Sequence, residues 1–174
     1  MQRPLADEYP KAFAGYVSLV PEADILAVLR TQTELVREVA RRTSPQRETY
    51  SYAPGKWTLR QVVGHVGDAE RVFGYRTLCI SRGDPAPLPG FDENAYVDAA
   101  SFNDIHLAAL VDEFASLRSA NLRLIETLRV DQWPAAGIAN GNAITVRGLA
   151  YVMAGHVHHH LKVLRDRYMA GAEG

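Results

Sequence analysis

Residues 145–168, TVRGLAYVMAGHVHHHLKVLRDRY, carry a clear helical pattern and four of the six histidines of the chain. A helix turns about 100° per residue, so His156 and His160 lie about 40° apart, on the apolar face. His159 falls at the edge of that face, and His158 falls on the opposite, charged side. The pattern predicts a helix from about Thr145 to about residue 168. The imidazoles of His156 and His160 should face the interior. His159 should lie at the boundary between interior and surface, and His158 should be in solvent.

Three further segments, residues 20–42, 57–78 and 103–130, repeat apolar residues at intervals of three and four. This spacing is typical of one buried face of a helix. Thr58 followed by Gln61 predicts a capping box at the start of the second segment. Asn103 or Asp104 is expected to cap the third. Pro- and Gly-rich stretches, SRGDPAPLPG at 81–90 and GIANGNAI at 137–144, should interrupt the helices.

Four amphipathic helices of about 20 residues predict an all-α four-helix bundle. The chain has 174 residues, enough for one domain with a sizeable core, and we expect a single domain over residues 1–174. The connections between the predicted helices are all longer than tight hairpins. The pattern alone therefore leaves the order and direction of the helices open.

Charge and composition exclude several classes of protein. The formal net charge is −1, with no basic stripe for nucleic acid and no polybasic segment for an anionic membrane. No apolar run approaches the roughly 20 residues that a spanning helix needs, and residues 1–13 lack an apolar signal core. The single Cys79 cannot form an internal disulfide, which fits a reducing compartment. We expect a cytoplasmic protein.

Two imidazoles at positions i and i+4 of one helix face can share a divalent ion, but a metal site needs a third protein ligand. His65 is the natural third ligand, because it lies on the apolar face of the helix at 57–78. Three neutral imidazoles suit Zn, Ni, Fe or Mn, and the sequence does not distinguish among these. The alternative is that each histidine is an ordinary core or rim residue.

Three other titratable residues of the predicted helices have side chains of the kinds used in catalysis. Asp68, one turn after His65, could orient a ligand imidazole through a hydrogen bond, or it could be an exposed helix charge. Glu70 falls about 140° from His65 and is expected to be structural or on the surface. His106 has no partner at useful spacing and is expected on the surface. The catalytic residues stay unassigned.

Two separated stretches resemble the DinB/YfiT-like family of metalloenzymes. PGKWTLRQVVGHVGDAE (54–70) is similar to the signature of its second helix, and ITVRGLAYVMAGHVHHHLKVLRDRY (144–168) to that of its last. GYVSLVPEADILAVLRTQ (15–32) also resembles the first helix of one branch. The resemblance implies an up-down-down-up bundle, often a homodimer. It further implies metal ligands at His65, His156 and His160, whereas His159 occupies a position where the family often has a histidine that is not a ligand.

The resemblance implies a metal-dependent activity on a small-molecule substrate. Characterised members include S-transferases and isomerases that use low-molecular-weight thiols such as mycothiol or bacillithiol, and a metal can hold a thiol as the reactive thiolate. A metal-dependent hydrolase with metal-activated water is the alternative. A second alternative is a non-enzymatic metal-binding or stress-response bundle. In that case a fourth side chain would complete the coordination of the metal. A scaffold that only binds a partner would need a large exposed apolar patch.

Overall fold

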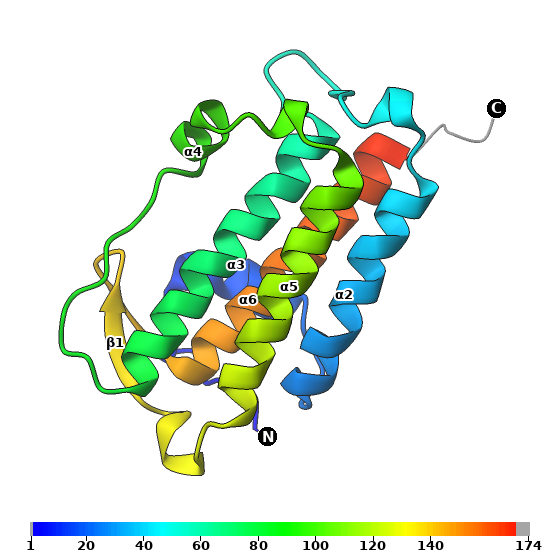
Figure 1. Cartoon of the computed structure of the whole chain (residues 1–174). Coiled ribbons are helices and arrows are strands. Elements are labelled where there is room, and N and C mark those ends of the chain that lie inside the picture. Colours follow the sequence, from blue (N-terminus) through cyan, green and yellow to red (C-terminus); the bar gives the residue numbers. More distant parts are fainter. Residues whose placement is uncertain (1, 170–174) are drawn as a thin grey trace.

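The computed structural model describes residues 2–169 of the chain, and four long helices dominate it (Figure 1). They confirm the predicted all-α bundle and are α2 (Ile25–Arg42), α3 (Leu59–Ser81), α5 (Leu107–Glu126) and α6 (Val146–Val163). α6 continues into a π-helical segment, η5 (Leu164–Met169). The shorter elements are η1 (Lys11–Phe13), α1 (Ala14–Ser18), η2 (Pro45–Arg47), α4 (Glu93–Ala99), η3 (Phe102–Asp104), η4 (Val130–Gln132), β1 (Ala136–Ala139) and β2 (Asn142–Thr145).

The helices have the up-down-down-up topology that the resemblance implied. In Figure 1, α2 and α6 run in one direction, and α3 and α5 run in the other. α3 and α5 are consecutive and parallel, so the chain between them returns along the outside of the bundle and forms α4 on the way. α3 packs against α5 and α6, and α2 packs against the same two helices. None of the helices in residues 2–169 is long and apolar enough to cross a membrane.

The predicted capping box at the start of α3 is confirmed. Thr58 Oγ1 accepts a hydrogen bond from the Gln61 amide at 3.1 Å, and Gln61 Oε1 accepts from the Thr58 amide at 2.8 Å. The expected cap of α5 by Asn103 or Asp104 is wrong, because both residues belong to η3 and α5 begins later. The amide of Leu107 donates instead to Glu48 Oε2 at 3.2 Å, so a carboxylate from another segment satisfies this helix end.

A buried polar network joins the four long helices at the centre of the bundle. Arg118 and Glu70 are 0% and 1% exposed and form a two-point ion pair, with both N–O distances 2.8 Å. Arg118 also donates to Gln32 Oε1 at 2.8 Å, and Gln32 donates to the Ala154 carbonyl at 2.7 Å. Asn121 donates to Glu70 at 2.8 Å. Of the two roles expected for Glu70, the structural one is therefore confirmed, and Glu70 is not on the surface.

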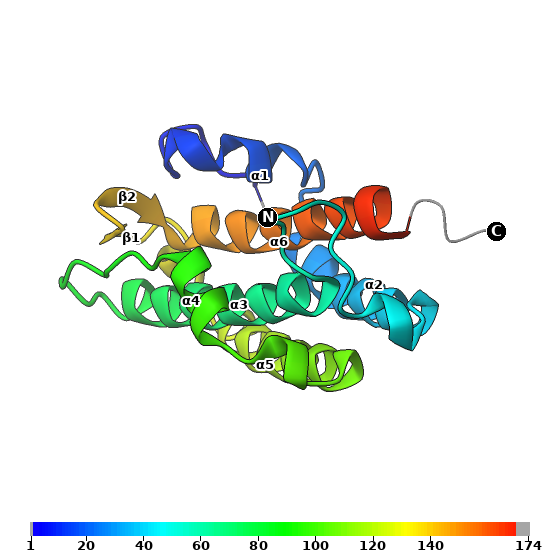
Figure 2. The ribbon, with the colours of Figure 1, turned by 90° about the horizontal axis from the view of Figure 1, so that it is seen from above.

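The N-terminal segment lies along α6, on the outside of the bundle (Figure 2). Two glycines seven residues apart, on one face of α6, allow this close approach. A Cβ at Gly148 would lie 2.3 Å from the Glu8 carbonyl oxygen, and a Cβ at Gly155 would lie 2.1 Å from that of Tyr16. The Glu8 carboxylate binds Arg147 at 2.6 Å. The helical pattern of the sequence did not predict this layer.

A β-hairpin immediately before α6 is a second element that helical periodicity missed. β1 and β2 pair antiparallel around Asn140 and Gly141, which have φ angles of 50° and 71°. Two central residues with positive φ are the mark of a type I′ turn, for which Asn-Gly is the favoured pair. The predicted glycine-rich interruption is thus an ordered turn. The turn also holds the chain that follows α3, since the Asn140 amide donates to the Leu88 carbonyl at 3.0 Å.

Candidate metal centre

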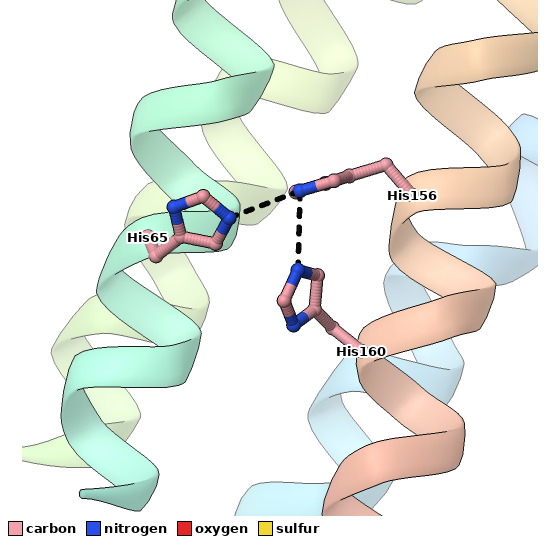
Figure 3. Close-up of side chains that lie close together, drawn as sticks. All are labelled: His65, His156 and His160. Carbon is pink, nitrogen blue, oxygen red and sulfur yellow. Dashed lines mark hydrogen bonds between the residues drawn. The ribbon is translucent and has the colours of Figure 1, made fainter. Parts of the chain in front are cut away.

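The structure brings His65, His156 and His160 together between α3 and α6 (Figure 3). His65 Nε2 lies 3.0 Å from His156 Nε2, and His160 Nε2 lies 3.1 Å from the same atom. His156 and His160 stand one turn apart on α6, and His65 faces them from α3. The sequence pattern had selected the same three histidines from their helix faces alone.

Burial keeps these three imidazoles neutral. His65 and His156 are each 5% exposed, and aromatic rings surround them. The ring centroids of Trp57 and His65 are 4.8 Å apart. The Tyr16 ring meets the His156 ring edge-on, with the centroids 5.5 Å apart. Desolvation lowers the pKa of His65 to about 4 and that of His160 to about 3, and it lowers the pKa of His156 well below its usual range. Neutral imidazole is the form that binds a metal.

The donor set fits a first-row divalent ion. Metal–imidazole bonds of about 2.1 Å hold two ligand nitrogens about 3.0–3.4 Å apart for angles of about 90–110° at the metal. The His65–His156 and His156–His160 separations fall in this range, and the ligand atoms of all three histidines lie within 4.8 Å of one another. Within residues 2–169, the buried Nδ1 of His160 has no hydrogen-bond partner. In the same residues, no cysteine, carboxylate or further histidine joins the group.

The remaining histidines lie outside the group. His159 is half-buried, and its ring meets the edge of Tyr16 at 5.5 Å. The expectation that His158 is in solvent is wrong, because α2 covers that side of α6 and His158 is half-buried beside Leu35 and Val39. His106 is exposed, as predicted, at the N-terminal end of α5.

Asp68 lies half-buried on α3, and burial raises the pKa of its carboxyl group. Its carboxylate contacts Arg71 at 3.4 Å. The hydrogen bonds within residues 2–169 include none between Asp68 and His65. The orienting role expected for Asp68 therefore stays a prediction that these contacts do not support.

Two cavities reach the histidines. The first, of about 260 Å³, is lined by Phe13, Tyr16, His65, Ala69, Phe73, Arg76, Phe91, Glu93, Asn140 and His156. The second, of about 280 Å³, is lined by Tyr52, Gly55, Lys56, Trp57, Val62, Asn94, His159, His160, Val163 and Tyr168. A larger groove of about 880 Å³ between α2 and α5 contains none of the histidines. The two smaller cavities are therefore the ones that bear on the chemistry.

Arg76 and Arg118 are site and core residues that the sequence analysis missed. Both occupy positions on the apolar face of their helix, three residues after Phe73 and four after Phe114. Gln32 and Asn121 were visible as polar interruptions of apolar stripes, and both belong to the Arg118 network. A charged or amide side chain at a core position was the available signal, since such groups are buried only when they have partners or a function.

Fold and site together define a class of protein: a four-helix bundle that carries a buried cluster of three histidines between its second and fourth long helices. The profile of the DinB superfamily matches residues 23–164, and the chain belongs to this superfamily.

Two solved structures share the fold. YfiT from Bacillus subtilis, described as a probable metal-dependent hydrolase with an unusual four-helix bundle topology, is 17% identical with a TM-score of 0.74. That match covers 95% of this chain and 93% of YfiT. A mycothiol-dependent maleylpyruvate isomerase is 14% identical with a TM-score of 0.67, and 84% of this chain matches 61% of the isomerase. Curated proteins yield no match to the sequence.

Proposed function

We propose that this protein is a metal-dependent enzyme in which His65, His156 and His160 hold one divalent ion. The proposal rests on the convergence of three buried, neutral imidazoles that line two cavities. First-row ions take at least four ligands, so three protein ligands leave a position for a reactant. A structural metal would need a fourth protein ligand, and residues 2–169 place no fourth histidine, cysteine or carboxylate in the group.

The side chains around the histidines would exclude water and position reactants. Trp57 packs on His65, and Phe73 meets His156 edge-on at 5.6 Å, so bulk water is kept from these faces of the ligands. A metal bound there would supply Lewis acidity, lowering the pKa of a coordinated thiol or water. Lys56 and Asn94 line the second cavity and could hold polar groups of a reactant through charge and hydrogen bonds.

The two cavities favour a reaction between two organic molecules. One reaches the cluster at His65 and His156, and the other reaches it at His160. A thiol-dependent transferase or isomerase would bind a low-molecular-weight thiol in one cavity and an electrophilic substrate in the other. The thiol dependence of the isomerase that shares the fold supports this choice. Hydrolysis is the second candidate, supported by the description of YfiT, and it would need only one cavity because water is small.

The test is an activity screen on untagged protein loaded with Zn²⁺, Ni²⁺, Fe²⁺ or Mn²⁺ in turn. Electrophilic substrates would be offered with and without mycothiol or bacillithiol, and simple esters and amides without thiol. We expect turnover that needs both metal and thiol and that His156→Ala abolishes, whereas His158→Ala retains it. Turnover of esters or amides without thiol would contradict the transferase and favour the hydrolase. Activity that His156→Ala leaves unchanged would contradict both.

A small-molecule substrate and a homodimer complete the proposal. The cavities of about 260 and 280 Å³ are of a size for small organic molecules rather than for a macromolecule. The net charge of −1 offers no basic surface for nucleic acid. Sedimentation equilibrium on metal-loaded protein tests the dimer: twice the 19.2 kDa chain mass is expected, and a single chain mass at micromolar concentration would contradict it.

A further inference from the structure

The first cavity combines polar and apolar lining groups. Its polar residues are Tyr16, His65, Arg76, Glu93, Asn140 and His156. Its apolar residues are Phe13, Ala69, Phe73 and Phe91. The lining therefore suits a molecule with an apolar body and a polar group.

Helix geometry places Arg76 and His65 on the same side of α3. They are eleven positions apart, which corresponds to about 20° around the helix axis and about 16 Å along it. Long side chains on a helix point back toward its N-terminus, which here is the direction of His65. The guanidinium can therefore hold one end of a bound molecule while the other end reaches the histidines.

Arg76 is a buried cation without a carboxylate partner. It is 4% exposed, and within residues 2–169 no carboxylate oxygen lies within 4.0 Å of it. Its one hydrogen bond in this part of the chain runs from Nη2 to the Pro89 carbonyl at 2.7 Å. Arg118, equally buried, has a two-point ion pair with Glu70. Burial lowers the pKa of Arg76, as expected for a cation that lacks a counter-charge.

The acid that shares this cavity does not neutralise Arg76. Glu93 lies on α4, is exposed and makes no ion pair with the guanidinium within 4.0 Å. Buried charges in proteins are ordinarily paired, and leaving one unpaired is costly. The contrast between Arg76 and Arg118 thus indicates that the partner of Arg76 comes from outside the described chain.

The loop that accepts the hydrogen bond of Arg76 is held in place by the β-hairpin. The Leu88 amide donates to the Ile138 carbonyl at 2.8 Å, and the Asn140 amide donates back to Leu88 at 3.0 Å. A Cβ at Gly90 would lie 2.2 Å from Asn140 Oδ1, so the hairpin turn and the loop pack without a gap. Arg76 bonds to Pro89 in the same loop. This end of the cavity is therefore built from three segments and is preorganised.

We propose that Arg76 binds the carboxylate of the substrate, and that the substrate is an aromatic or alkyl carboxylic acid whose apolar body lies against Phe13, Phe73 and Phe91. A guanidinium matches a carboxylate with two parallel N–H···O bonds, a geometry that a neutral amide cannot reproduce. The assignment of the reactive end to the histidines rests on the proposed function. Binding of the carboxylate at Arg76 does not require a metal.

The competing role for Arg76 is to anchor the loop through the Pro89 carbonyl. That role needs a donor but no bound anion. It predicts that Arg76 variants change stability without changing which ligands bind. Ligand preference is thus the readout that a structural role would not move.

The test uses metal-free, full-length protein and a matched pair of probes, 4-phenylbutanoate and 4-phenylbutanamide, with affinities measured by calorimetry. Hydrogen bonds to charged groups support an expected preference of about tenfold or more for the carboxylate. Arg76→Gln should abolish the preference. Arg82→Gln removes an exposed positive charge at the end of the same helix and should keep the preference.

Equal affinity of the wild-type protein for the two probes would overturn the proposal, and this result does not depend on whether any variant folds. A preference that survives Arg76→Gln would overturn it too. Because no metal is present, the result is separable from the proposed function. If the carboxylate preference is absent but the histidines retain metal, only this inference fails. If the preference is present and no metal is retained, only the metal assignment fails.

Discussion

Gly155 of α6 lies directly beneath the backbone of Tyr16, so close that a Cβ at Gly155 would come within 2.1 Å of the Tyr16 carbonyl oxygen. The next residue on α6 is His156, and the Tyr16 ring meets its imidazole edge-on at 5.5 Å. Tyr16 also lines the first cavity. One glycine thus sets how closely the N-terminal segment approaches the histidine cluster.

Gly155→Ala should push α1 away from α6, since the obstacle is backbone rather than a movable side chain. Overpacking of this kind costs about 1–3 kcal/mol, which a urea titration would detect. Gly15→Ala is the matched control, because a Cβ at Gly15 meets nothing within 4 Å. If the Gly155 and Gly15 variants were equally stable, the close approach of α1 to α6 would be wrong.

Because the ion pair between Arg118 and Glu70 is buried, we expect two arginine substitutions to lower the free energy of unfolding by very different amounts. Arg118→Met would leave Glu70 charged in the core, and removing one partner of a buried pair costs about 3–5 kcal/mol. Arg30→Met removes an exposed arginine that pairs with Glu126 at 2.7 Å and should cost less than about 1 kcal/mol. Arg118→Met with Glu70→Met should recover part of the loss. A loss from Arg118→Met no larger than that from Arg30→Met would argue against the network.

Tyr168 predicts a loss of stability at alkaline pH. Its hydroxyl donates to the Trp57 carbonyl at 2.6 Å, and burial raises its pKa to about 12. The unfolded chain loses this proton near pH 10, before the folded chain does, so the free energy of unfolding falls as pH rises from 10 toward 12. The advantage of wild type over Tyr168→Phe should be constant below pH 9 and shrink above pH 10. An advantage that stayed constant to pH 11 would contradict the shifted pKa.

Helix faces explain why much of the site could be predicted. His65, His156 and His160 each lie on an apolar stripe, and the stripes of α3 and α6 must face one another to be buried. The capping box of Thr58 and Gln61 was predictable because it is local. The topology is not local. Periodicity says nothing about the path of the chain between α3 and α5, so the order and direction of the helices could be predicted only from the family resemblance.

The elements that sequence analysis missed depend on contacts between distant segments. α1 is five residues long, and its close approach to α6 depends on Gly155, which lies 139 positions after Tyr16 (155 − 16). Leu107 is capped by Glu48, which no pattern within α5 can indicate. Arg76 and Arg118 look alike in sequence, and only the structure shows that Arg118 has a carboxylate partner and that Arg76 has none within the described residues.

The most direct test of the central claim is the metal content of untagged protein, measured by mass spectrometry after gel filtration. We expect about one first-row divalent ion per chain in the wild type, and a loss of at least tenfold in each of His65→Ala, His156→Ala and His160→Ala. His158→Ala should keep the wild-type content, because His158 lies outside the cluster. Wild-type protein without metal, or full metal content in His156→Ala, would contradict the three-histidine centre.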